Sequence, residues 1–239
     1  MIRNITLLLC ITLVLALAPK AQAQVGAEAL IEANRATLER RYDDALKLYN
    51  VYINENPEDF RGYFNRGTTR YNAKMFKDAE NDFTKTLSLN PIYKEAYYYR
   101  SQCFLSQKKY TQAINDCTHV LQSDSNSVPF LKLRSSAYQS NDQSKLALLD
   151  LDKAVTLSKL SGDLYKRRAE LKVKMHDYDG AIRDYGSVEK LLPKYKMVHF
   201  IKGNLYLKIN ETEFACEEFQ LALDNRIVVA DRAFESNCQ

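Results

Sequence analysis

An alanine recurs every 34 residues along most of the chain, with larger, mostly apolar side chains three positions before it and four positions after it. This spacing places the three side chains on one face of an α-helix. The alanines are Ala45, Ala79, Ala113, Ala147, Ala181 and Ala215. The residues before them are Tyr42, Phe76, Tyr110, Ser144, Tyr178 and Thr212, and those after them are Tyr49, Phe83, Cys117, Leu151, Tyr185 and Phe219.

A second small residue stands twelve positions before each alanine, which predicts a second helix in every repeat. These residues are Ala33, Gly67, Ser101, Ser135, Ala169 and Gly203. Two small residues at fixed places let antiparallel helices approach closely, while larger neighbours interdigitate around the contact. Proline follows the second helix at Pro57, Pro91 and Pro193, where it ends the helix. One helix pair cannot bury its own apolar faces, so neighbouring pairs must stack.

The pattern places two helices in each of six repeats and a short helix at the end. First helices are expected near 27–38, 60–73, 94–107, 128–140, 162–174 and 196–208. Second helices are expected near 42–55, 76–89, 110–123, 144–158, 178–191 and 212–223. A final segment from Val228 to Ser236 is typical of a capping helix. We therefore predict an all-α solenoid that behaves as one elongated domain.

This pattern resembles the tetratricopeptide repeat family over about residues 26–225. The best segments run from Tyr63 to Pro91 and from Tyr97 to Leu121, whereas the first and fourth repeats match least well. The resemblance implies a right-handed superhelix with a concave inner face that binds peptides or protein elements. It does not extend to the carboxylate clamp of that family, because Phe64 and Tyr98 stand where the clamp has lysine.

The resemblance also assigns the inner face to first-helix residues. In the first half of the array these are rich in aromatic and amide side chains, which suit contacts with a peptide through ring area and backbone hydrogen bonds. The candidate groove residues are Phe64, Asn65, Tyr71, Tyr98, Tyr99 and Gln102. The alternative is that these rings only pack between repeats. Later repeats contribute basic residues, including Lys132, Lys166 and Arg167.

A base on the first helix and an acid on the second helix also recur with the 34-residue period. The bases are Arg66, Arg100, Arg134, Arg168 and Lys202, and the acids are Asp82, Asp116, Asp150, Asp184 and Glu218. The first repeat lacks both. Five equal copies suit an interhelical ion pair that stabilises each repeat far better than one active site.

The first 23 residues have the three-part plan of a secretory signal peptide. Arg3 precedes an almost wholly apolar run from Ile5 to Ala18, and Ala21-Gln22-Ala23 is a small-x-small cleavage signal. The run would span about 21 Å, short of a bilayer core of ~30 Å. We expect cleavage after Ala23, an array over 24–239 with a cap over about 226–239, and a periplasmic or secreted protein. The alternative is an uncleaved anchor.

Four cysteines follow the predicted cleavage site, and export would permit disulfides. Cys216 opens the last second helix and Cys238 ends the cap. If the cap runs antiparallel to that helix, the two residues meet, which makes them a candidate disulfide. Cys103 and Cys117 lie in one repeat, but only Cys117 has a core phase, so a bond between them is not expected.

The remaining features favour binding over catalysis. The net charge of +4 gives little electrostatic support for nucleic-acid binding, and no second apolar stretch is long enough to span a membrane. The sequence contains no nucleotide-binding motif and no metal-ligand spacing, and its three histidines stand in no nucleophile or zinc motif. We expect a non-enzymatic scaffold for proteins or extended peptides, with no cofactor. The alternatives are a structural component of a cell-envelope assembly and a non-catalytic subunit of an enzyme complex. The oligomeric state is left open.

Overall fold

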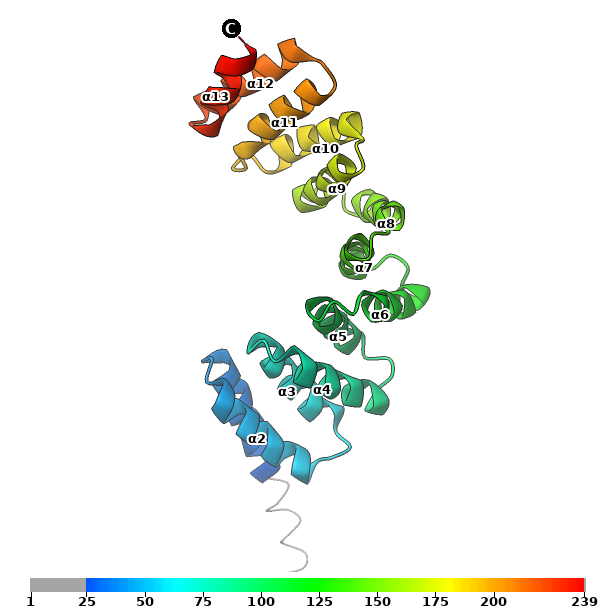
Figure 1. Cartoon of the computed structure of the whole chain (residues 1–239). Coiled ribbons are helices and arrows are strands. Elements are labelled where there is room, and N and C mark those ends of the chain that lie inside the picture. Colours follow the sequence, from blue (N-terminus) through cyan, green and yellow to red (C-terminus); the bar gives the residue numbers. More distant parts are fainter. Residues whose placement is uncertain (1–24, 239) are drawn as a thin grey trace, which may run out of the picture. The chain divides into compact units, whose positions relative to one another are not determined.

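The computed structural model describes residues 25–238, and every regular element in that range is an α-helix (Figure 1). Residues 25–38 are helical and precede α2. The predicted signal peptide, residues 1–23, lies outside the described residues. The remaining helices are α2 (Tyr42–Glu55), α3 (Phe60–Asn72), α4 (Phe76–Leu89), α5 (Lys94–Ser106), α6 (Tyr110–Ser123), α7 (Val128–Ser140), α8 (Ser144–Leu157), α9 (Gly162–Lys174), α10 (Tyr178–Leu191), α11 (Met197–Lys208), α12 (Thr212–Asp224) and α13 (Val229–Asn237).

These bounds agree with the sequence-based helices to within one or two residues, and they confirm an all-α fold of tandem helix pairs. None of the described helices combines the length and the apolar composition that a membrane crossing requires. The chain divides into two compact units, with the boundary between Val120 and Leu121 inside α6. The expectation of one continuous domain stays a prediction.

The small residues are the places where paired helices touch. All six phased alanines, Ala45 to Ala215, have no exposed surface. At Gly203, a Cβ atom would lie only 2.5 Å from the ring of Phe219, and at Gly67 it would lie 2.9 Å from the ring of Phe83. A side chain at these two glycines would therefore push the paired helix away, which explains why the repeat keeps small residues there.

The turns inside the repeats use left-handed backbone without glycine. A residue with φ between 56° and 63° stands between the two helices of every repeat. These residues are Arg40, Lys74, Lys108, Asp142, His176 and Asn210. Left-handed backbone costs a non-glycine residue roughly 1–2 kcal/mol. Its recurrence at the same place in six repeats shows that helix packing imposes this turn.

The predicted base–acid pairs form in all five later repeats. In the first unit, Arg66 and Arg100 each place two nitrogens against the carboxylate on the following helix. In the second unit, Arg134 and Arg168 make the same two bonds, to Asp150 and Asp184, and Lys202 contacts Glu218. The five acids are almost fully buried, so each pair satisfies a carboxylate inside the helix interface.

At the end of the second unit, α13 packs against α12 as the predicted cap. A disulfide joins Cys216, in the first turns of α12, to Cys238, directly after α13, with their Cα atoms 5.6 Å apart. The bond holds the end of α13 against α12, and the short connection from Asp224 to Val229 holds its start. Both ends of the cap are therefore tied to the last repeat. Cys103 and Cys117 remain buried thiols, and Cys117 donates to the Ser101 hydroxyl.

Candidate peptide-binding face

Helices α3 and α5 of the first unit carry the six candidate groove residues. Phe64, Asn65 and Tyr71 lie on α3, and Tyr98, Tyr99 and Gln102 lie on α5. All six side chains are partly buried, neither enclosed in the core nor fully exposed. We call the rings of Phe64, Tyr71, Tyr93, Tyr98 and Tyr99 the aromatic face.

Tyr99 is the centre of the aromatic face. Its ring centroid lies 5.9 Å from that of Phe64, 5.5 Å from that of Tyr71 and 5.8 Å from that of Tyr98, each in an edge-on arrangement. On its other side Tyr99 stacks on the buried Phe83, with centroids 5.7 Å apart and planes at 17°. The core of the second repeat therefore fixes the position of Tyr99, and Tyr99 in turn holds the rings around it.

The sequence analysis missed Tyr93, which belongs to this face. It precedes the first turn of α5, and its ring lies 4.9 Å from Phe64 at 86° and 5.0 Å from Phe60. Burial raises the pKa of the Tyr93 hydroxyl. Tyrosine recurs at the same phase only at Tyr195, three repeats later, and this single recurrence was the signal that could have identified it.

The amide side chains of the face serve as partners for other polar groups. The Tyr71 hydroxyl donates to Oε1 of Gln102, and burial raises the pKa of that hydroxyl. Asn65 donates through Nδ2 to Oδ1 of Asn34 in the first repeat, at 3.3 Å. Gln102 thus links α3 to α5, while Asn65 links α3 to the helix of residues 25–38.

The rings of the aromatic face pack between repeats and also keep accessible surface. Phe64, Tyr71 and Tyr99 pack against the buried cluster around Phe83, so they do hold neighbouring repeats together. Each of them nevertheless keeps part of its surface accessible. Tyr98 lies beside them and meets the edge of Tyr99, with ring centroids 5.8 Å apart. The face therefore offers rigid ring surface that is already ordered before a ligand arrives.

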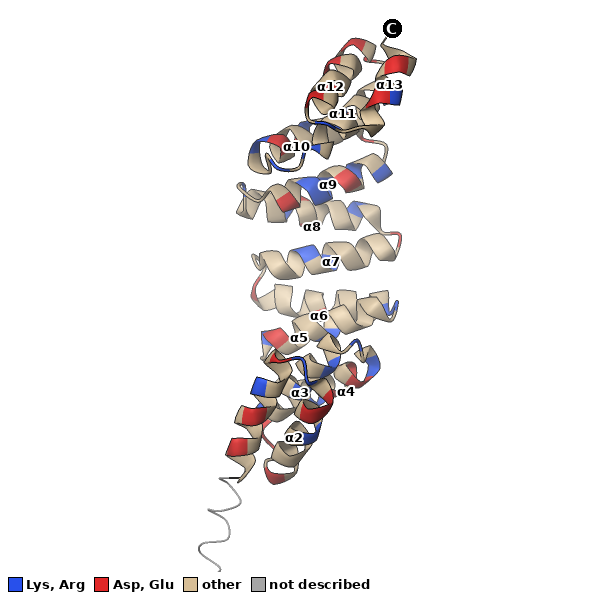
Figure 2. Ribbon diagram, turned by 90° about the vertical axis from the view of Figure 1, so that its left-hand side faces the viewer, with Lys and Arg blue, Asp and Glu red and all other residues tan. Residues whose placement is uncertain are grey.

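At the phase of Phe64 and Tyr98, α7 and α9 carry Lys132 and Lys166, whereas α11 carries a ring, Phe200. Figure 2 shows several charged positions on α9 and few on α7. Lys132 and Arg167 both pair with Asp163, at 2.7 and 3.1 Å, and the Lys166 ammonium lies 4.4 Å from the ring centroid of Tyr195. These contacts balance much of the basic character that the sequence suggested.

A recess of about 210 Å³ lies between α7 and α9. It is lined by Ser136, Gln139, Ser140, Arg167 and Glu170. Its wall holds one cation, one anion and three neutral polar side chains, so it favours a small polar group over an apolar anchor.

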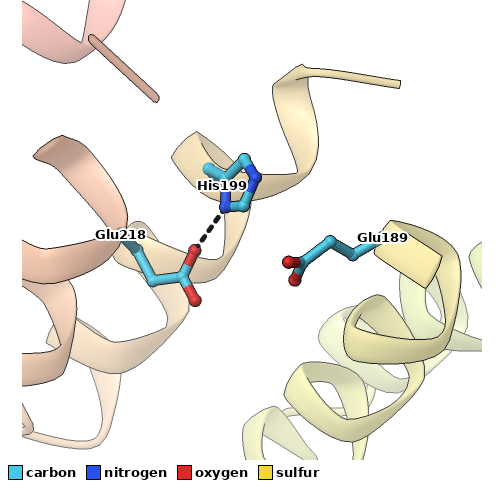
Figure 3. Close-up of side chains that lie close together, drawn as sticks. All are labelled: Glu189, His199 and Glu218. Atoms are coloured by element: carbon cyan, nitrogen blue, oxygen red, sulfur yellow. Dashed lines mark hydrogen bonds and ion pairs between the residues drawn. The ribbon is translucent and has the colours of Figure 1, made fainter. Parts of the chain in front are cut away.

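Three potential metal ligands, Glu189, His199 and Glu218, approach each other where α10, α11 and α12 meet (Figure 3). Their ligand atoms lie within 4.8 Å of one another, and His199 Nδ1 is 2.8 Å from Glu218 Oε2. The Lys202 ammonium, however, lies 2.9 Å from Glu189 and contacts Glu218 as well. Burial opposes charge on Lys202, but the hydrogen bonds that its ammonium donates to both carboxylates raise its pKa overall. The cluster thus already contains a cation, and we assign it to holding three helices together.

Part of the chain matches the model of a known repeat family. Residues 64–126 match the family model described as tetratricopeptide repeat. The chain is 24% identical over 199 residues to Tetratricopeptide repeat protein 6 of Homo sapiens, an overlap that covers 80% of this chain and 38% of that protein. It spans about two fifths or less of the length of the first curated relatives that it matches.

Solved structures share the fold. A tetratricopeptide repeat protein from Parabacteroides merdae superposes with a TM-score of 0.71 at 16% identity, covering 90% of this chain and 94% of its own. YrrB, described as "a TPR protein with an unusual peptide-binding site", superposes with a TM-score of 0.65 at 21% identity, covering 78% of this chain and 97% of its own. At these identities the likeness concerns the fold alone. The comparisons therefore show tetratricopeptide repeat sequence over residues 64–126 and a fold that the chain shares with tetratricopeptide repeat proteins.

Proposed function

We propose that this chain is an exported, non-catalytic adaptor that binds an extended segment of another protein on the aromatic face of α3 and α5. The observation that carries the proposal is the set of interlocked, partly accessible rings centred on Tyr99. Aromatic rings supply large contact area at a small entropic cost, and they are enriched among residues that dominate binding energy. Their position is fixed in advance by Phe83, which lowers the cost of ordering the site.

The chemistry of the face defines the ligand. Its rings carry no charge, and its amides at Asn65 and Gln102 can exchange hydrogen bonds with a peptide backbone. We therefore expect a segment with one or two apolar or aromatic anchors, bound in extended form. The description of YrrB as a protein with a peptide-binding site is in keeping with this proposal.

Export is the second part of the proposal. It rests on the signal-peptide pattern of residues 1–23 and on the disulfide between Cys216 and Cys238. Disulfides persist in oxidising compartments such as the periplasm and the extracellular space. Intact mass of the protein recovered from a secreting host tests this part: a chain that starts at Gln24 supports export, and the full-length mass contradicts it.

The binding test uses the oxidised protein of residues 24–239. Peptides that bind this protein are first selected from a displayed library of random sequences. We expect the Tyr98→Ala variant to bind the selected peptides roughly 30-fold more weakly, corresponding to about 2 kcal/mol for an aromatic anchor. The matched control is Phe200→Ala, which changes the residue of the same repeat phase in α11.

The control should bind as the wild type does, and circular dichroism and thermal melting should show that Tyr98→Ala keeps its fold. Unchanged peptide binding by Tyr98→Ala would exclude the aromatic face as the working surface. If Tyr98→Ala binds more weakly and also melts at a lower temperature than the wild type, Tyr98 is assigned to packing alone.

A further inference from the structure

Helix α8 exposes an unusual number of leucines in the second unit. Leu146, Leu149 and Leu157 are 42%, 64% and 41% exposed, and Leu160, just beyond the helix, is 86% exposed. The three helical leucines and Lys153 are spaced three or four residues apart, so they form one stripe along α8. The stripe faces away from the helices that α8 packs against, because those contacts use the buried Ala147, Leu151 and Ala154 on the other side of α8.

The other repeats show that the fold does not need leucine at positions 146 and 149. The residues that correspond to Leu146 in the other second helices are Asp44, Asp78, Gln112, Gly180 and Phe214. Those that correspond to Leu149 are Lys47, Asn81, Asn115, Arg183 and Glu217. Nine of these ten equivalents are polar, charged or glycine, and the tenth is Phe214 in α12. Leu146 and Leu149 therefore serve something other than the stability of a repeat, whereas the equivalents of Leu157 include Leu89 and Leu191.

Helix α12 carries a matching stripe of opposite charge. Phe214 and Leu221 are 49% and 43% exposed, and Glu217 lies between them on the same side. Glu213 and Asp224, both exposed, flank the stripe. The α8 stripe has Lys153 at its centre and the exposed Lys145 on its flank. One stripe is thus apolar and basic, and the other is apolar and acidic.

We propose that the α8 stripe of one copy of this chain docks on the α12 stripe of a second copy. With the two helices antiparallel and Lys153 opposite Glu217, the helical spacing sets Leu149 against Leu221 and Leu157 against Phe214. The same register sets Lys145 close to Asp224. Two leucines thus meet apolar side chains and two lysines meet acids, while Leu146 falls at the edge of the contact beside Asp224; this pattern of charges is the complementarity that selects one partner over others.

This contact joins two different surfaces, so it is heterologous. Each copy offers both stripes, and association continues beyond a dimer unless the copies close on one another. Both stripes lie in the second unit, on α8 and α12 (Figure 1), whereas the aromatic face lies in the first. The proposed contact uses no residue of the aromatic face, so substitutions on the two surfaces test the two proposals independently.

Sedimentation velocity on oxidised residues 24–239, from about 1 to about 100 µM, tests the proposal. The wild type should show a weight-average mass that rises with concentration. Lys153→Glu and Glu217→Lys should each weaken association at least about 10-fold, because each places like charges face to face. An equimolar mixture of the two variants should associate again, since every α8–α12 contact between unlike variants pairs opposite charges. The matched control is Lys85→Glu, which reverses the equivalent charge on α4 and should leave association unchanged.

Leu149→Asn provides a second test, because it installs the residue found at the same phase at Asn81 and Asn115. It should abolish association without lowering the melting temperature. A wild type that stays monomeric over the whole range overturns the proposal. So does association that survives both charge reversals, or a mixture of the two variants that stays monomeric. Binding of the monomeric wild type to vesicles with anionic lipid, lost in Lys153→Glu, would assign the α8 stripe to a membrane surface instead.

Discussion

Arg100 on α5 and Asp116 on α6 stand sixteen residues apart, and the Arg100 guanidinium donates two hydrogen bonds to the Asp116 carboxylate. Nε donates to Oδ2 at 2.8 Å and Nη2 donates to Oδ1 at 2.7 Å. Burial raises the pKa of Asp116, and Arg100 opposes that rise. The planar guanidinium also lies against the rings of Tyr97 and Phe104. One residue therefore satisfies a buried acid and covers two aromatic rings.

We expect Arg100→Ala to lower the free energy of unfolding by about 1–3 kcal/mol, because it leaves Asp116 buried without its main hydrogen-bond donor. Urea denaturation at neutral pH measures the loss. Arg183→Ala, at an exposed arginine of α10, is the control and should change stability by less than about 0.5 kcal/mol. Equal stability of Arg100→Ala and wild type would contradict a structural role for the pair.

Substitution of glycine by alanine should change stability in opposite directions at two helical positions, Gly203 and Gly186. A Cβ at Gly203 would lie 2.5 Å from the Phe219 ring, so Gly203→Ala should cost about 1–3 kcal/mol through overpacking. Gly186, inside α10, has nothing within 4 Å of the same position. Gly186→Ala should therefore stabilise the protein by about 0.5–1 kcal/mol, because alanine is the better helix former. Thermal unfolding of both variants measures these changes. If the melting temperature shifts in the same direction for both variants, the helix-crossing role of Gly203 is refuted.

The disulfide should stabilise the cap. It closes a loop between residues 22 positions apart, so Cys238→Ser should lower stability by about 3 kcal/mol. Thiol titration gives an independent check on oxidised residues 24–239. In denaturant, two thiols should react, those of Cys103 and Cys117. In the folded protein Cys103 should react very slowly, because burial raises its pKa to about 12. Four reactive thiols in denaturant would show that the bond does not form.

Acid should weaken the start of α3 through Asp59. The hydrogen bond from Arg61, together with that from Tyr52, lowers the pKa of Asp59 to about 2 even though burial opposes this. A depressed pKa means that the charged form stabilises the fold. This contribution is complete above the ordinary value of 3.8 and disappears as the pH falls toward 2.

Asp59→Asn keeps an N-cap side chain but removes the charge, so it isolates this contribution. The variant should be less stable than the wild type at pH 6, and the difference should shrink between pH 4 and pH 2. A difference that stays constant over this interval would show that the carboxylate of Asp59 titrates normally.

The aromatic face shows how far the candidate site could be predicted. The repeat phase placed Phe64 and Tyr99 on first helices, and the structure brings their rings together. The phase could not show that Tyr99 stacks on Phe83, because that contact joins different repeats. The prediction also left out Tyr93, which lies before α5 and whose one phased counterpart, Tyr195, gave only a weak signal.

The sequence by itself determined the helix pairs and the positions of their closest contacts. A buried alanine such as Ala113 leaves no room for a larger side chain, so a period of small residues records the helix crossings directly. The base–acid pairs followed for the same reason, since a buried carboxylate needs a partner on the helix that covers it.

Only the tertiary structure decided what depends on directions in space. Lys108 adopts left-handed backbone, although this position has no glycine from which such a turn could be predicted. The packing of two helices outweighs the local preference of the residue. Lys202 pairs with Glu189 as well as with Glu218, its partner in the repeat pattern. The additional pair forms because α10 ends beside Lys202. The exposure of Leu149 likewise required the fold, because a helical pattern gives the spacing of side chains but not which face a neighbouring helix covers.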